Sequence, residues 1–117
     1  IIEINPGYLD LVKRHPEVSP ILSNPRVEIV IDDGRRYLQR HPELRWDVVV
    51  MNTTWHWRGH ATNLLSQEFF RIVTPRLLPG GLFYFNTTMS IPAMKTALDS
   101  TRPTTTAPAA IAAVNGQ

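Results

Sequence analysis

The chain has 117 residues, 43% of them hydrophobic, which is the size and composition of one globular domain. It contains no cysteine, so disulfides, thiolate nucleophiles and cysteine-based zinc sites are excluded. The arginines are scattered, with Arg35 and Arg36 the one adjacent pair, and they form no stripe suited to a nucleic-acid backbone. No apolar run approaches the roughly 18 residues that cross a bilayer. We therefore expect a soluble, cytoplasmic protein with no nucleic-acid or membrane partner.

Four short apolar runs recur along the chain, at residues 1–4, 27–31, 48–51 and 82–85. They are mostly continuous and rich in Val and Ile, which is typical of parallel strands that are buried on both faces. Polar side chains lie at the end of each run or just after it: Glu3, Asn5, Asp32, Asp33, Asn52 and Asn86.

Helical segments separate the apolar runs. Asn5 can cap a first helix that has Pro6 at its first position and ends near His15. A second, short helix is predicted from Asp33 to about Arg40. In the third helix Ser66 is the expected N-cap.

At the start of the third helix, Leu65 and Phe70 occupy the two positions of a hydrophobic staple around the cap.

Proline marks the end of the third helix. Pro75 lies inside the apolar pattern and predicts a kink or tightening of the helix. Pro79, followed by two glycines, is predicted to end the helix and turn the chain into the fourth run.

A boundary near residue 100 divides the chain by composition. Residues 1–99 form the expected α/β domain, whose last helical piece lies at 91–98. Residues 100–117 are rich in Thr, Pro and Ala, which predicts a mobile tail. Within this tail the weak apolar run 109–114 could instead dock as an edge strand.

Strict alternation of strand and helix predicts a parallel sheet with crossover helices. Ligands of such sheets bind outside the carboxyl ends of the strands, where the polar residues named above would gather. A single Asx residue after a strand usually forms a turn or a helix cap. Several of them on one edge favour a binding site there.

Five segments carry a more specific pattern: residues 2–5 (IEIN), 25–35 (PRVEIVIDDGR), 46–52 (WDVVVMN), 65–70 (LSQEFF) and 78–81 (LPGG). Together they resemble the spermidine synthase family and, more broadly, the S-adenosylmethionine-dependent methyltransferase fold. The resemblance implies a Rossmann-like parallel sheet that is partial here, lacking its first strand and the glycine-rich turn after it. Because the chain starts inside a strand, we expect it to be a piece of a longer polypeptide.

The same resemblance implies a nucleoside-binding site. Glu3 matches the acid that holds the ribose hydroxyls, and a carboxylate can accept from both of them. Asp33 matches the residue that accepts from the adenine amino group, with Gly34 allowing close approach of the backbone. An N-cap role for Asp33 is compatible with this, since its carboxylate has two oxygens.

Asn52 departs from the family pattern. Spermidine synthases carry Asp–Ser–x–Asp–Pro at this place, and the first Asp helps to deprotonate the attacking amine, whereas this chain has Asn52 and, at the second acid, Trp55. An amide cannot act as a general base near neutral pH. Asn52 therefore marks lost or altered chemistry and leaves open whether the chain is an enzyme.

Other polar and aromatic residues of this loop favour no separate site. His56 and His60 are four residues apart, but they lack the Glu of a zinc protease and Gly59 argues against a helix, so no metal is expected. Trp55 and Trp57 could stack on a ligand or serve as packing aromatics.

Three functions follow. The resemblance favours a domain related to aminopropyl transfer from decarboxylated S-adenosylmethionine to a small-molecule amine, and leaves open whether this chain is active. The alternatives are an S-adenosylmethionine-dependent methyltransferase and a non-catalytic interaction module.

The absence of the family's first strand also affects how the remaining strands can pair. That strand lies in the middle of the family's sheet, so its absence leaves backbone groups unpaired on the strands at 1–4 and 48–51. We expect these two strands to pair directly, in the order 3-2-4-5 of the family's strands, or a homodimer to exchange strands.

Overall fold

The computed structural model describes residues 1–52, 61–86, 90–100 and 110–114. The chain forms two compact units, Ile1–Arg40 and His41–Gln117, and each is described by itself. Both units combine helices with a parallel sheet, which confirms the α/β class. Among the described residues, no helix is long and apolar enough to span a membrane.

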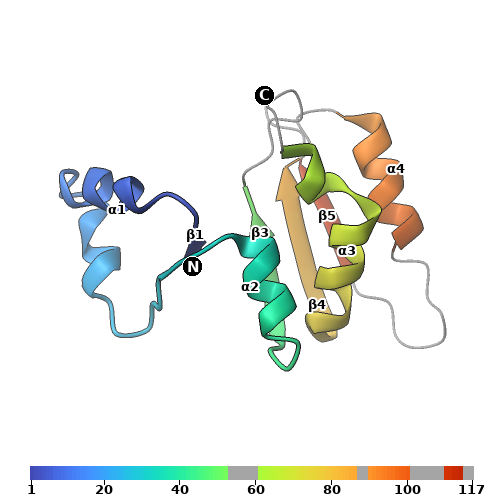
Figure 1. The fold of residues 1–117 in the computed structure, drawn as a ribbon, viewed down its shortest axis with the longest axis horizontal. Helices are drawn as coiled ribbons and strands as arrows, with labels where there is room; N and C mark the ends of the chain where they lie inside the picture. Colours follow the sequence, from blue (N-terminus) through green and yellow to red (C-terminus); the bar gives the residue numbers. More distant parts are fainter. Residues whose placement is uncertain (53–60, 87–89, 101–109, 115–117) are drawn as a thin grey trace. The chain divides into compact units, whose positions relative to one another are not determined.

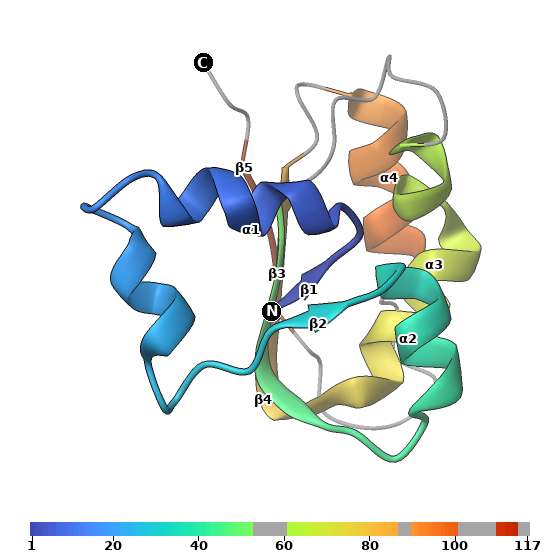
Figure 2. The same ribbon diagram turned by 60° about the vertical axis from the view of Figure 1, so that its left-hand side comes forward.

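The first unit is built around a two-stranded sheet. Its strands β1 (Ile2–Glu3) and β2 (Val30–Ile31) are parallel, and Glu3 lies opposite Ile31. Helix α1 (Pro6–Lys13) and a 3₁₀ helix (Ser19–Ser23) connect the two strands, and α2 (Gly34–Arg40) follows β2. Figure 2 shows β1 and β2 side by side, with α1 and α2 each starting beyond the end of a strand.

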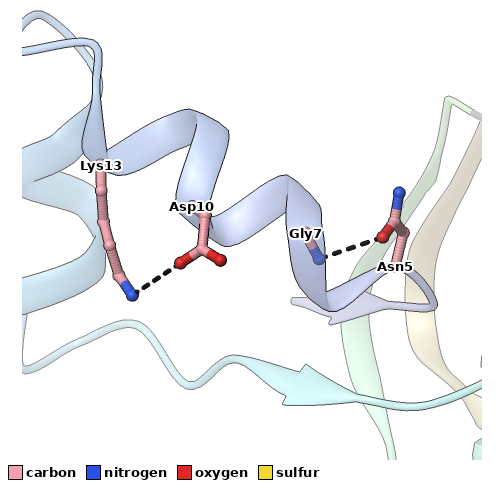
Figure 3. A network of polar contacts seen from close by, with 4 residues as sticks. All are labelled: Asn5, Gly7, Asp10 and Lys13. Atoms are coloured by element: carbon pink, nitrogen blue, oxygen red, sulfur yellow. Dashed lines mark hydrogen bonds and ion pairs between the residues drawn. The ribbon is translucent and has the colours of Figure 1, made fainter.

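The start of α1 is the one that the sequence predicts. The Oδ1 atom of Asn5 accepts a hydrogen bond of 3.0 Å from the backbone N–H of Gly7, and Pro6 occupies the first turn (Figure 3). Further along the helix, Lys13 and Asp10 form an exposed ion pair of 3.1 Å. The helix ends at Lys13, shortly before the predicted stop at His15.

The second unit contains a three-stranded sheet in the order β3-β4-β5, with all neighbours parallel. Its strands are β3 (Trp46–Met51), β4 (Leu77–Asn86) and β5 (Ala110–Val114). Its helices are α3 (Gln67–Val73) and α4 (Ile91–Ser100), and two 3₁₀ helices, Ala61–Leu65 and Thr74–Arg76, flank α3.

Local sequence sets the ends of α3. The Ser66 hydroxyl accepts a hydrogen bond of 3.2 Å from the backbone N–H of Phe69, which confirms the predicted N-cap. Pro75 has the predicted tightening effect, because the α-helix stops at Val73 and continues as a 3₁₀ turn. The predicted end at Pro79 is wrong, since β4 already begins at Leu77.

Pro79 and the glycines after it form an irregularity within β4. Trp46 of β3 pairs with Leu77, yet Val48 pairs with Leu82. Between these two pairs β4 therefore contains more residues than β3. Gly80 has a φ of 78°, a conformation that glycine adopts without steric cost. The bulge re-aligns β4 with β3 for the rest of their length.

Three phenylalanines form the centre of the second unit. Phe70 on α3 and Phe83 and Phe85 on β4 are completely buried, and their ring centroids lie 5.1–5.5 Å apart. Such tilted and edge-on contacts are favourable for aromatic rings. Figures 1 and 2 show α3 and α4 together on one face of the β3–β4–β5 sheet.

The expectation that the strands are buried on both faces is wrong. Val48 and Val50 of β3 are 52% and 65% exposed, whereas Met51 is buried. Because successive side chains of a strand point to opposite faces, helices on one face bury every second residue. In the first unit, Ile1, Ile4 and Ile31 are also exposed.

β1 and β3 belong to two separate sheets, one in each unit, and the expected direct pairing of the strands at 1–4 and 48–51 stays a prediction. Within each sheet the predicted neighbours are correct, β1 beside β2 and β3 beside β4.

The alternative of an edge strand near the C-terminus is the one that the structure takes. β5 pairs in parallel with β4, with Ala110 opposite Leu82 and Val114 opposite Asn86. It thus extends the sheet on the side away from β3. The division into residues 1–99 and a mobile tail stays a prediction.

Candidate functional site

The carboxyl edge of the β1–β2 sheet gathers three acidic residues. Glu3 is the last residue of β1, and Asp32 and Asp33 directly follow β2. The backbone N–H of Asp32 donates a hydrogen bond of 3.0 Å to the carbonyl of Glu3. The parallel pairing therefore brings Glu3 and the two aspartates to the same edge, as the sequence predicts for them.

The carboxylate of Glu3 is half-buried and held at one oxygen. Its Oε1 atom accepts a hydrogen bond of 2.7 Å from the backbone N–H of Asn5. Within the described parts of the chain, no group donates to its second oxygen. Glu3 can thus accept from a ligand without giving up its contact to the start of α1.

Asp33, like Glu3, accepts a backbone hydrogen bond at one carboxylate oxygen. Its Oδ1 atom accepts from the backbone N–H of Arg36 at 2.9 Å, and its carbonyl accepts from Tyr37 at 2.8 Å. Asp33 is therefore the N-cap of α2, which the sequence predicts as one of its roles. No described residue donates to the Oδ2 atom.

Gly34, the residue after Asp33, has open space where a side chain would lie. A Cβ atom built on Gly34 would meet no atom within 4 Å, and its φ is not in the left-handed region. The backbone conformation therefore does not require glycine here. The absence of a side chain leaves room at the edge of the sheet, as close approach of a ligand would need.

Asp32 uses both of its oxygens within the protein. Oδ1 accepts from the backbone N–H of Asp33 at 2.8 Å, and Oδ2 forms an ion pair with the guanidinium of Arg40. The sequence analysis assigns Arg40 only to the end of the helix. The signal that could have found the pair is an acid two residues before a helix that carries an arginine in its second turn.

A second carboxyl edge belongs to the other unit. Asn52 follows β3 and is exposed, and Asn86 is the last residue of β4. Because Met51 pairs with Phe85, the two asparagines follow in neighbouring register positions. The six polar residues expected on one edge therefore follow the strands of two sheets: Glu3, Asn5, Asp32 and Asp33 belong to the first sheet, and Asn52 and Asn86 to the second.

Four aromatic and histidine residues of the sequence analysis follow Asn52. Trp55, His56, Trp57 and His60 lie outside the described residues. Within residues 1–52, 61–86, 90–100 and 110–114, no three His, Asp or Glu side chains are grouped as a metal ion would need.

Most of the chain matches a known protein family. Residues 1–108 match the spermine/spermidine synthase domain. The chain belongs to the spermine/spermidine synthase family. This confirms the resemblance carried by the acidic turn around Asp33 and by the Leu65–Ser66 helix start.

Individual members of the spermine/spermidine synthase family show how far the likeness extends. The chain is 32% identical over 84 residues to the polyamine aminopropyltransferase of Korarchaeum cryptofilum, covering 70% of this chain and 26% of that protein. It is 33% identical over 82 residues to the enzyme of the same name from Thermoplasma volcanium, covering 69% and 29%. It is 30% identical over 83 residues to the spermine synthase of Arabidopsis thaliana, covering 70% and 23%. The chain thus spans about a quarter of the length of these relatives.

Proposed function

We propose that this chain provides the nucleoside-binding part of an aminopropyltransferase. The observation that carries the proposal is the pair of half-engaged carboxylates at the β1–β2 edge. Glu3 and Asp33 each bond the backbone through one oxygen, while no described residue bonds the other. In this proposal Glu3 accepts from the ribose hydroxyls and Asp33 accepts from the adenine amino group. Relatives named polyamine aminopropyltransferase and spermine synthase support the choice of reaction, aminopropyl transfer.

The geometry of the edge suits a nucleoside in three respects. The two carboxylates come from neighbouring parallel strands, so they can contact different parts of one ligand. Each free oxygen is an acceptor, which matches hydroxyl and amino donors. The open space at Gly34 allows the ligand to approach the backbone. The proposal also concerns the fold: the strands of this chain would form part of the complete methyltransferase-like sheet of the family.

Decarboxylated S-adenosylmethionine would supply an aminopropyl group from its sulfonium. The residues of this chain would bind and orient its nucleoside end, which supports transfer by positioning the reacting atoms. Asn52 can accept a hydrogen bond from an attacking amine, but its amide cannot take up the proton near neutral pH. The chain therefore contributes binding without the family's general base at this position.

The neutral side chain of Asn52 favours a second candidate. Methyl transfer from S-adenosylmethionine needs no carboxylate base at this position. The nucleoside end of S-adenosylmethionine is the same, so Glu3 and Asp33 would have the same roles. A non-catalytic interaction module that has lost the ligand is the third candidate.

Thermal-shift titration of the 117-residue chain separates the three candidates. We expect methylthioadenosine and decarboxylated S-adenosylmethionine to raise the melting temperature, because a ligand at about 100 times its Kd adds about 2.7 kcal/mol to the free energy of unfolding. A larger shift with S-adenosylmethionine than with its decarboxylated form would favour the methyltransferase. No shift with any of the three would favour the interaction module and contradict the proposal.

A further inference from the structure

The Asp32–Arg40 ion pair joins the two ends of α2 to the site edge. Asp32 lies two residues before the first residue of the helix, and Arg40 is the last residue of the helix. Helical side chains tilt toward the N-terminus, so a long arginine in the second turn can reach back to a residue that precedes the helix. The side chain of Asp32 is 17% exposed and that of Arg40 is 55% exposed.

Asp32 is also the residue that connects Glu3 to Asp33. Its backbone N–H donates to the Glu3 carbonyl at 3.0 Å, and its Oδ1 atom accepts from the Asp33 N–H at 2.8 Å. Asp33 is thus fixed at two points, by this bond to its N–H and by its own cap bond to Arg36. The direction of its second oxygen depends on both.

Arg40 is the positive charge that this acidic edge receives from the described residues. Three carboxylates follow two adjacent strands, and Arg40 contacts Asp32 alone among them. The pairing keeps the Asp32 carboxylate turned toward the helix, and it leaves Glu3 and Asp33 available for a ligand.

We infer that Asp32, held by Arg40, is a positioning residue that aims the Oδ2 atom of Asp33 at the 6-amino group of an adenine. This inference rests on the proposed function and adds a determinant of base specificity to it. Asp32 does not touch the ligand in this arrangement. Its effect reaches the base through the peptide of Asp33, while the ribose contact of Glu3 stays unchanged.

Calorimetry with two nucleosides tests the inference. Methylthioadenosine carries the 6-amino group, and methylthioinosine replaces it with an oxygen. The Kd of methylthioinosine divided by the Kd of methylthioadenosine therefore measures recognition of that group. We expect Asp32→Asn and Arg40→Met each to reduce this ratio by about tenfold, the effect of losing one charge-assisted hydrogen bond. Asp32→Asn keeps an oxygen for the Asp33 N–H, and Arg40→Met leaves Asp32 intact, so neither variant removes the fold's backbone contacts. Arg40→Lys, which restores the charge, should recover most of the ratio.

Asp10→Asn is the matched control, because it breaks the exposed Lys13–Asp10 pair of the same unit away from the site edge (Figure 3). It should leave the ratio unchanged. An equal weakening of both nucleosides in Asp32→Asn and Arg40→Met would reveal a purely structural role and overturn the inference, as would unchanged binding of both. A wild-type chain that binds neither nucleoside would overturn the proposed function and this inference with it. Binding by the wild type together with an unaltered ratio in the variants would overturn the inference alone.

Discussion

The Oε1 atom of Glu3 accepts a hydrogen bond of 2.7 Å from the backbone N–H of Asn5. Asn5 in turn caps α1 through Gly7, so the strand end and the helix start are joined by consecutive bonds. Glu3→Gln keeps an Oε1 acceptor for Asn5 and changes the second oxygen into an NH₂ donor. The variant therefore tests the free oxygen without disturbing the local structure.

We expect Glu3→Gln to weaken methylthioadenosine binding at least about tenfold, because charge-assisted bonds contribute about 1.5–3 kcal/mol each. Isothermal calorimetry measures the Kd, and thermal unfolding checks that the melting temperature is unchanged. Glu28→Gln is the control, since Glu28 is exposed and precedes β2 rather than following it. Unchanged affinity in Glu3→Gln would return Glu3 to an ordinary residue at the end of a strand.

The helix starts at Asn5 and Ser66 and the tightening of α3 at Pro75 were predictable because they depend on neighbouring residues. Asn5 and Ser66 cap the next N–H groups along the chain, and Pro75 lacks the N–H that an α-helix needs. The parallel direction of the strands followed from the alternation of strand and helix, and the neighbours within each sheet followed from the family resemblance. These signals are local or depend on the order of elements, and a single sequence contains both.

What the sequence could not supply depends on residues far apart in space. The exposure of Val48 and Val50 follows from which face of the sheet the helices cover, and a continuous apolar run does not encode this. The Asp32–Arg40 pair depends on how the Arg40 side chain folds back along α2, which the predicted bounds of the helix do not specify. The edge position of β5 depends on a weak apolar run whose partner strand was not specified.

Gly81 allows β3 and β4 to approach closely. A Cβ atom at this position would lie 2.8 Å from the carbonyl oxygen of Leu78 and 3.1 Å from that of Asp47. Both are backbone atoms that cannot turn away, so we expect Gly81→Ala to lower the free energy of unfolding by about 1–3 kcal/mol. Urea denaturation followed by circular dichroism measures this change.

Gly34→Ala is the control for that measurement, because a Cβ there meets nothing within 4 Å. Its free energy of unfolding should stay the same or rise by about 0.4–1 kcal/mol, as alanine restricts the unfolded chain. Equal stability of the two variants would show that the β3–β4 spacing adapts to a side chain at Gly81.

The aromatic cluster makes Phe70 the residue with the largest expected effect on stability. Its ring is fully buried and lies 5.5 Å from Phe83 and 5.1 Å from Phe85. Phe70→Ala should cost about 3–5 kcal/mol, since it removes these contacts and leaves a cavity. Ile91→Ala serves as the comparison, because Ile91 is 77% exposed and its truncation should change stability by less than about 0.5 kcal/mol. A loss below about 1 kcal/mol in Phe70→Ala would contradict the assignment of this cluster as the core of the second unit.

A substitution at Asn52 tests whether this position accounts for the lost or altered chemistry. Asn52 follows β3 at the carboxyl edge of its sheet and is exposed, next in register to Asn86. Asn52→Asp restores the carboxylate that the family carries at this place, so an attacking amine would again meet a charged acceptor that can help to remove its proton. We expect the variant to create or increase the conversion of putrescine and decarboxylated S-adenosylmethionine into spermidine and methylthioadenosine, detected by mass spectrometry.

The comparison variants decide what a gain would mean. Asn86→Asp places the same charge at the neighbouring strand end and should yield no product, so a gain there would point to charge alone rather than to the position of Asn52. Trp55 takes the place of the second acid of the family motif, and the double variant Asn52→Asp with Trp55→Asp should exceed the single one, because a second carboxylate attracts the diamine. A wild-type chain that already converts putrescine as fast as ordinary family members would show that Asn52 is compatible with catalysis and that the base lies elsewhere.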